Sequence, residues 1–265
     1  MRGPGPYGQD AGMTFPLMRG YDHINVVAQL DPVAAVRDRE LGERILQYPK
    51  LLPGGSPDFG HAVQKGKEWR IASLGCDDPS SARYSLAIDL RTDAPDEKDP
   101  RTARAMLAAA DRLDPEEGEQ LAKDEWEIGD RRYRVIRVES FTLVGGGVME
   151  PPRATDTDPP RGARLLRDHL VDPLAPTGQW ETQLRLNLVG LLPIPGTVPD
   201  QILAEARHAT QTHPGVVMLP PTFKVVEIKG DSWEPFAGGD GPGDARHCLA
   251  TYFTELLPRL REFQG

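Results

Sequence analysis

A glycine-rich stretch near the end of the chain holds the residues best suited to bind a ligand. It reads GGDGPGD over Gly238–Asp244 and lies where an expected strand gives way to an expected helix. Free backbone N–H groups at a helix start can bind an anion. The sequence therefore predicts an anion-accepting site. Its candidate residues are Gly239, Asp240, Gly241, Asp244 and Arg246, together with Arg83 at the same position of an earlier helix.

The same stretch also fits a helix start without a ligand. Pro242 suits the first helical position, and Asp244 places a carboxylate where it interacts favourably with the helix dipole. Asp77 and Asp78 occupy the equivalent place in the first half of the chain, where they would fill an anion site with protein carboxylates. No lysine follows at the spacing of a P-loop. Both interpretations stay open at this point.

The other reactive side chains form no recognisable catalytic pattern. The chain has no Gly-x-Ser-x-Gly motif, and neither Cys76 nor Cys248 belongs to a Cys-x-x-Cys motif. Cys248 lies on the apolar side of its expected helix, which indicates a core position. Glu205 and His208 form a single Glu-x-x-His pair, which is half of a di-iron site. We therefore expect no catalytic residue, no metal and no cofactor, and histidines that lie at the surface or in caps.

An internal duplication places the two candidate arginines at equivalent positions. FGHAVQKGKEWRIASLG over Phe59–Gly75 aligns without a gap with FKVVEIKGDSWEPFAGG over Phe223–Gly239, and five positions are identical. After a one-residue change in length, Arg83 aligns with Arg246. A duplication of this kind brings the two arginines into a shared cleft, or leaves each one paired with a carboxylate of its own unit.

Each copy is predicted to form a β-α-β-β-α unit, in which prolines end the first helices and glycines form the hairpin turns. In the first copy, the predicted strand is Ile24–Leu30, the first helix Pro32–Tyr48, the hairpin turn Gly66-Lys67 and the start of the last helix Pro79. In the second copy, the corresponding elements are Leu184–Leu192, Pro199–His213, Gly230-Asp231 and Pro242. The first strands are predicted from their β-forming residues.

The predicted fold class is α+β, with the two units related by a pseudo-two-fold axis and a hairpin and Pro-rich loop inserted between them. The predicted divisions are a disordered N-terminal extension over 1–20, a first unit over 21–92, an insertion over 93–181 and a second unit over 182–265. The insertion is expected to contain a helix over 101–113, a hairpin of strands 126–128 and 133–144, and a loop over 145–180.

Composition and charge exclude several classes of protein. The 265 residues carry 31 basic and 40 acidic side chains, a net charge of −9, which disfavours nucleic-acid binding through the overall field. The basic run Arg131–Arg137 faces Asp124, Glu125 and Glu127 of the neighbouring strand, so cross-strand ion pairs explain it. No apolar run approaches about 18 residues, so no membrane span is expected. Without a secretory signal, we expect a cytoplasmic protein whose two cysteines are free thiols.

Several short stretches resemble an uncharacterised protein family of streptomycete-type actinobacteria, domain of unknown function 5954. They are DPVAAV over 31–36, RYRVIR over 132–137, EPPRATD over 150–156, and HPG over 213–215 with Leu219-Pro220. The resemblance covers about residues 20 to 260. It implies an actinobacterial, cytoplasmic origin, and the family supplies no activity, cofactor or site residue.

Two functions of different classes are consistent with the sequence. The first is a non-catalytic protein that binds another protein in an adaptor or immunity-like role, because an acidic surface favours a basic partner. The alternative is an enzyme or small-molecule sensor with an anion-accepting site between the two repeat units. A protein partner is thus expected, a small molecule stays possible, and no membrane or nucleic-acid partner is expected. Neither the partner nor the oligomeric state follows from the sequence.

Overall fold

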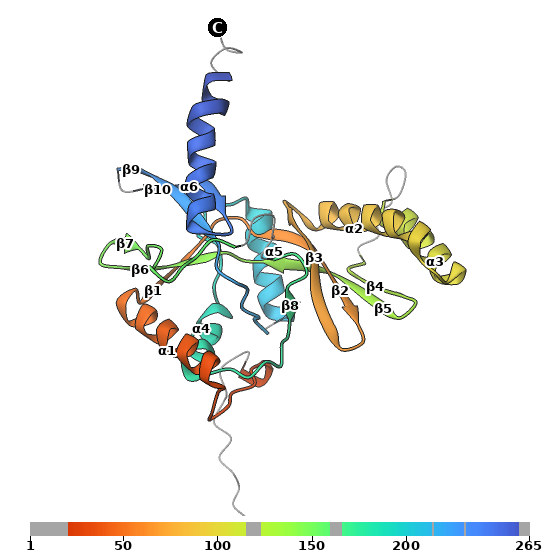
Figure 1. Ribbon diagram of the computed structural model, residues 1–265, viewed down its shortest axis with the longest axis horizontal. Helices are drawn as coiled ribbons and strands as arrows, with labels where there is room; N and C mark the ends of the chain where they lie inside the picture. The colour runs from red at the N-terminus through yellow and green to blue at the C-terminus, as the bar shows by residue number, and fades with distance from the viewer. Residues whose placement is uncertain (1–20, 115–122, 160–165, 214, 231, 260–265) are drawn as a thin grey trace, which may run out of the picture.

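A computed structural model describes residues 21–114, 123–159, 166–213, 215–230 and 232–259. Over these residues, three antiparallel sheets are surrounded by helices (Figure 1), which confirms the α+β class. The extension predicted over residues 1–20 and the turn residue Asp231 lie outside the described residues. None of the described helices is long and apolar enough to cross a membrane.

A long, bent two-stranded ribbon joins two of the sheets. Strands β1 (Lys50–Pro53) and β2 (Asp58–Lys65) form one side, and β5 (Arg131–Val138) and β6 (Phe141–Gly145) form the other. The ribbon bends where the Gly54 N–H donates to the Ser140 carbonyl at 2.7 Å. An ideal Cβ at Gly54 would lie 2.6 Å from the Ser140 Cβ, so the close approach requires glycine. The single strand predicted over 133–144 is therefore divided between two sheets.

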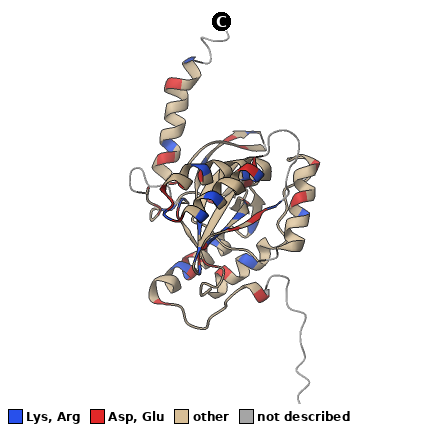
Figure 2. Ribbon diagram, turned by 90° about the vertical axis from the view of Figure 1, so that its right-hand side faces the viewer, with Lys and Arg blue, Asp and Glu red and all other residues tan. Residues whose placement is uncertain are grey.

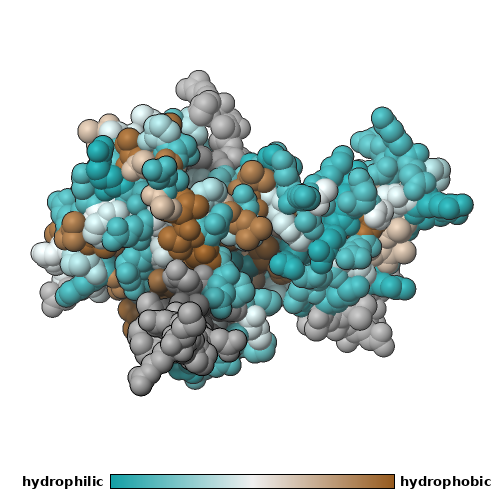
Figure 3. All heavy atoms as spheres, turned by 90° about the horizontal axis from the view of Figure 1, so that it is seen from below, coloured by the Kyte–Doolittle hydropathy of each residue, from teal (hydrophilic) through white to brown (hydrophobic). Residues whose placement is uncertain are grey.

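The larger sheet carries the main hydrophobic core. Its strand order is β4-β5-β2-β3-β8, completed by β3 (Glu68–Cys76), β4 (Glu125–Ile128) and β8 (Leu170–Val171). Helices α2 (Pro79–Asp93) and α3 (Pro100–Leu113), joined by the short helix η2 (Ala94–Asp96), lie beside it in Figure 1. The core consists of Leu86, Ala87, Leu90, Ala94, Met106, Ala109, Ala110, Leu113, Trp126, Ile128 and Tyr133. Around it, the end of the molecule that holds α2 and α3 is mostly hydrophilic (Figure 3).

Three helices begin with the same Asp-Pro pair. Asp31 caps α1 (Pro32–Gln47), Asp78 caps α2 and Asp99 caps α3, and each carboxylate accepts backbone N–H groups of the first turn. An aspartate before a proline combines a side-chain acceptor with a residue whose φ already suits a helix. The first-helix prediction from Pro32 and the last-helix prediction from Pro79 are thus confirmed.

Helix α1 also holds the Pro-rich segment in place. Arg44 forms a two-point ion pair with Glu150, in which the Arg44 Nη2 donates to the Glu150 carboxylate at 2.8 Å. The Glu150 side chain is 11% exposed. Arg153 pairs with Glu40 at 3.3 Å and with Asp156 at 3.2 Å. Next to these contacts, β7 (Val148–Met149) extends the second sheet, in the order β1-β6-β7.

The predicted first strands are wrong in both copies. Leu184 to Leu188 belong to helix α4 (Gln179–Leu188), where Asp38 of α1 accepts the N–H groups of Trp180 and Glu181 at 3.3 and 2.9 Å. This cap comes from outside the segment, so local β propensity did not reveal it. Residues 24–30 form one isolated bridge, between Val26 and Thr177.

The C-terminal part repeats the order helix, hairpin, helix. Helix α5 (Asp200–Thr212) precedes the hairpin of β9 (Phe223–Lys229) and β10 (Ser232–Gly239), which α6 (Pro242–Thr251) follows. The N-terminal part has α1, an additional strand β1, the hairpin of β2 and β3, and then α2, and the two hairpins lie in separate sheets. The internal duplication therefore stays a prediction. Helix α6 continues as a π-helical turn, η3 (Tyr252–Leu256), and extends away from the rest of the molecule in Figures 1 and 2. The pseudo-two-fold axis remains a prediction.

Candidate functional site

The two arginines predicted to share a site lie on separate helices, and α2 and α6 are well apart in Figure 1. Arg83 donates to Asp124 at 2.7 Å, and its side chain is 12% exposed. Asp124 belongs to the insertion predicted over 93–181, so the carboxylate that Arg83 contacts lies outside its own predicted unit. Arg246 is exposed on α6.

A carboxylate of the protein occupies the predicted anion-binding end of α6. Asp158, from the Pro-rich segment, accepts the N–H groups of Gly243 and Asp244 at 2.6 and 3.2 Å. An ideal Cβ at Gly241 would lie 2.6 Å from the Asp158 Cα, so the missing side chain makes room for this segment. The glycine-rich stretch therefore fits a helix start capped by a distant residue. Its role in binding a ligand stays a prediction.

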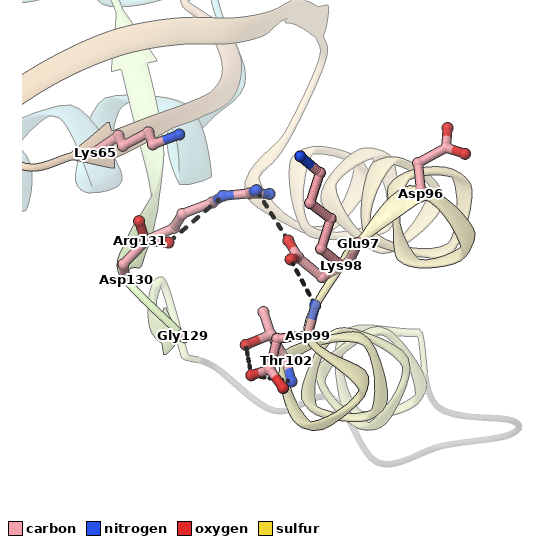
Figure 4. A pocket seen from close by; sticks show the side chains of 9 residues that line it. All are labelled: Lys65, Asp96, Glu97, Lys98, Asp99, Thr102, Gly129, Asp130 and Arg131. Carbon is pink, nitrogen blue, oxygen red and sulfur yellow. Dashed lines mark hydrogen bonds and ion pairs between the residues drawn. The ribbon is translucent and has the colours of Figure 1, made fainter.

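A polar cavity of about 590 Å³ opens beside the β4–β5 turn (Figure 4). Lys65 at the end of β2 and Arg131 at the start of β5 lie on one side, and the segment that leads into α3 lies on the other. Arg131 donates to Glu97 at 3.0 Å, and Asp130 lies 3.9 Å from the Arg131 Nε. The residues that line this cavity are Lys65, Asp96, Glu97, Lys98, Asp99, Thr102, Gly129, Asp130 and Arg131.

A second cavity, of about 400 Å³, adjoins the first along the sheet. The two share Lys65 and Arg131, and the second adds Val63, Ala72 and Tyr133 of the sheet face. Burial raises the pKa of the Tyr133 hydroxyl, and the neighbouring Arg131 guanidinium acts in the opposite direction. Tyr133 therefore contributes a neutral ring and hydroxyl at physiological pH.

His61 borders this second cavity and is buried, with 1% of its side chain exposed. Its Nε2 lies 3.0 Å from Asp89 on α2, whereas its Nδ1 has no hydrogen-bond partner among the described residues. Burial lowers the pKa of His61, and the nearby Asp89 opposes that shift. The expectation that the histidines lie at the surface or in caps is therefore wrong for His61.

The basic run of β5 is paired with acidic residues, as predicted. Arg132 contacts Glu127 at 3.2 Å and Glu125 at 3.4 Å, and Arg134 also pairs with Glu125. Basic and acidic residues are interspersed in Figure 2. These arginines therefore meet negative charge within the protein's own sheet.

The cysteines differ from each other in their surroundings. Burial, followed by Asp78 and Asp77, raises the pKa of the Cys76 thiol, which makes the reactive thiolate scarce. Cys248 is exposed on α6, so the predicted core position is wrong. The projection of α6 away from the body leaves this side of the helix uncovered.

Over the described residues, no three His, Cys, Asp or Glu side chains are grouped to hold a metal ion.

Aromatic side chains gather at the surface of the C-terminal hairpin and helix. Phe236 of β10 meets Tyr252 edge-on, with ring centroids 4.5 Å apart, and Phe253 stacks near Phe236 at 6.1 Å. Exposed fractions are 37% for Phe236, 55% for Phe253 and 49% for Leu256. We call Phe236, Tyr252, Phe253 and Leu256 the aromatic surface. Large apolar side chains that remain this exposed in a cluster are typical of an interaction site.

The family model described as a family of unknown function, DUF5954, matches residues 31–265. The chain belongs to this family. No curated protein and no solved structure matches the chain. The DUF5954 match begins at Asp31, the cap of α1, and extends over the larger sheet, the two cavities and the aromatic surface.

Sequence reasoning about this DUF5954 chain missed both His61 and the cap of α6. The alternation of Phe59, His61 and Val63 within β2 was an available signal, because alternate residues of a strand share a face. For Asp158 the sequence held no local signal, since it contacts Gly243 across 85 residues. The two adjoining cavities likewise depend on turns and a helix start that are far apart in the chain.

Proposed function

We propose that this protein works by binding another protein through the aromatic surface of its C-terminal hairpin and helix. The observation that carries the proposal is the exposure of Phe253 and Leu256 on a helix that extends away from the body. Aromatic side chains are enriched at protein interfaces, where a few residues contribute most of the binding energy. A non-catalytic adaptor or immunity-like role accords with a surface of this kind.

The open edges of the adjacent sheet support the same proposal. Strands β9 and β10 pair only with each other among the described strands, and no further backbone hydrogen bond reaches them from another described segment. Pro235 protects β10 against strand addition, since proline has no N–H to donate, whereas β9 contains no proline. The free edge of β9 is therefore a place for strand addition, on the same two-stranded sheet that carries Phe236 of the aromatic surface.

We expect the partner to carry net positive charge. The chain has a net charge of −9, and Glu255 is exposed on the same π-helical turn as Phe253. Opposite charge on a partner increases the association rate and disfavours acidic competitors. The family resemblance implies an actinobacterial, cytoplasmic origin, so we expect the partner in the cytoplasm of such cells.

Site-specific photocrosslinking in actinobacterial cells tests the proposal. A photoreactive phenylalanine analogue replaces Phe253 in one strain and Tyr84 in another. Both are aromatic residues of similar exposure, at 55% and 52%, and Tyr84 lies on α2, away from the aromatic surface. We expect one specific basic protein to be crosslinked at position 253 and not at position 84, with a yield that falls as salt increases.

Three results would contradict this expectation. Equal crosslinking at both positions would indicate non-specific contact. The absence of a crosslink at position 253 would contradict the proposed role of the aromatic surface. A crosslink to a second copy of the chain would replace the basic partner with self-association. In purified protein, Phe253→Asp should abolish the complex and leave the urea midpoint unchanged, because the side chain is more than half exposed.

A further inference from the structure

The second cavity lies between the larger sheet and helix α2, and the side of it that the helix forms is acidic. Strands β2, β3 and β5 supply one wall, and Asp89 and Asp93 of α2 supply the other. The two aspartates are four residues apart, so they share one face of the helix, with Cβ atoms about 6 Å apart. Like charges at this spacing destabilise a helix, and a cation between them removes the repulsion.

The cations that border this cavity lie next to other carboxylates. Lys65 faces Glu68 directly in the β2–β3 register, and Arg70 pairs with Glu68 at 3.0 Å. Arg131 donates to Glu97 at 3.0 Å, as drawn in Figure 4. None of these three cations forms an ion pair with an aspartate of α2. Over the lining of both cavities, seven carboxylates stand against four cations, so the local field favours a positively charged molecule.

Asp93 is the carboxylate of this cavity that is open to a ligand. It precedes η2 without a side-chain cap, and it forms no hydrogen bond or ion pair with a described residue. Burial raises the pKa of the Tyr133 hydroxyl, and the charge of Asp93 adds to that shift, so the carboxylate lies near the aromatic ring. A carboxylate beside an aromatic ring suits an ammonium group, because the face of the ring also attracts a cation.

His61 adds a buried acceptor to the same cavity. Its Nε2 lies 3.0 Å from Asp89, so the neutral ring carries its proton on Nε2 and leaves a lone pair on Nδ1. This Nδ1 has no hydrogen-bond partner among the described residues, and the side chain is 1% exposed. Buried polar atoms in native proteins nearly always have a partner. A ligand that carries N–H donors satisfies this atom.

The sheet supplies an apolar wall opposite the aspartates. Val63 and Ala72 are half-buried there, and Tyr133 is 7% exposed. The volume of about 400 Å³ lies within the range of about 300 to 1,000 Å³ that is typical of small-molecule sites. The cavity therefore combines an acidic side with an apolar side.

We propose that the second cavity binds a small organic amine in its protonated form. The ammonium group lies between Asp89 and Asp93 and donates to the His61 Nδ1. The apolar part of the molecule lies against Val63 and the Tyr133 ring. The site is on the larger sheet, away from the aromatic surface, so it is independent of the proposed protein partner.

Isothermal titration of the full-length protein with phenethylamine and with phenethyl alcohol tests the site. The two probes share the same apolar part, and only the amine carries a positive charge at about pH 7.5, as a lysine side chain does. We expect saturable one-to-one binding of the amine. Binding of the alcohol should be weaker by about tenfold or more, because hydrogen bonds to charged groups are the stronger ones.

Asp93→Asn removes one charge from the site. It should weaken phenethylamine by about fivefold and leave phenethyl alcohol unchanged. Asp96→Asn is the matched control. Asp96 is exposed like Asp93, borders only the larger cavity, and points away from that cavity in Figure 4. Circular dichroism confirms that each variant is folded.

The nitrogen NMR resonance of the His61 Nδ1 reports the third contact directly. We expect it to shift when phenethylamine saturates the protein, while the resonances of His208, exposed on α5, stay in place. The proposal is overturned if phenethylamine shows no saturable binding, if phenethyl alcohol binds equally well, or if Asp96→Asn weakens the amine as much as Asp93→Asn does. An unmoved His61 resonance at saturation would also overturn it.

Discussion

At the scale of single residues, His61 makes the stability of the protein depend on pH. Burial lowers the pKa of its imidazole below the ordinary value of 6.5, and Asp89 reduces that shift without reversing it. Between the native pKa and 6.5 the unfolded chain therefore binds more protons than the native state. Stability contributed by the neutral ring is complete above pH 6.5 and is lost as the pH falls below it.

We expect His61→Gln to reduce this acid sensitivity. At about pH 7.5 the variant should lose about 1 kcal/mol, because it disturbs a buried hydrogen bond, and the difference from the natural protein should narrow at about pH 5.5. Urea unfolding at the two pH values measures the change. His208→Gln is the control, because His208 is exposed on α5. A difference that widens on acidification would contradict the assignment.

At the scale of elements, α6 depends on a carboxylate that it does not carry. Its cap residue is Gly241, and Asp158 supplies the acceptor for the N–H groups of Gly243 and Asp244. Asp158→Ala should lower the free energy of unfolding by about 0.5 to 2 kcal/mol, the usual cost of a lost cap. It should also accelerate hydrogen exchange at the Gly243 and Asp244 amides.

The control for this substitution is Asp77→Ala, at an exposed aspartate with no hydrogen bond to a described residue. It should change neither the stability nor the exchange of α6. If the amides of Gly243 and Asp244 exchange at the natural rate in Asp158→Ala, the cap lies elsewhere.

Sequence patterns predicted elements whose signals are local. The helix starts at Pro32 and Pro79 and the glycine of the hairpin turn at Gly66 each depend on residues within a few positions, and each prediction was correct. The strand predicted from Leu184 was wrong, because this segment belongs to a helix whose cap is supplied by Asp38, 143 residues before Glu181. The cavities were missed for the same physical reason, since Lys65 and Lys98 approach each other only through tertiary structure.

At the scale of the whole molecule, buried apolar contacts are unevenly distributed. The core cluster lies between the larger sheet and helices α2 and α3. In the C-terminal hairpin and helix, Gly241, Pro242 and Ala245 are the buried residues over the described part of 223–259. So few buried side chains give this region little hydrophobic stabilisation. Local opening of this region therefore requires less free energy than opening of the core.

Hydrogen exchange followed by mass spectrometry measures this difference along the chain. We expect peptides from β9, β10 and α6 to exchange before those from β2, β5 and α2 under native conditions. Addition of a partner that binds the aromatic surface should slow exchange in the C-terminal region. Equal protection of the two regions in the free protein would show that the molecule opens as a single cooperative unit.

The two kinds of helix cap imply an order of folding. Helices α1, α2 and α3 carry their own aspartate beside the first turn, so each can begin as soon as its residues meet. Helices α4 and α6 begin at glycines, Gly178 and Gly241, and receive their carboxylates from Asp38 and Asp158. They are therefore expected to complete only after distant parts of the chain have come together, with the C-terminal helix forming late.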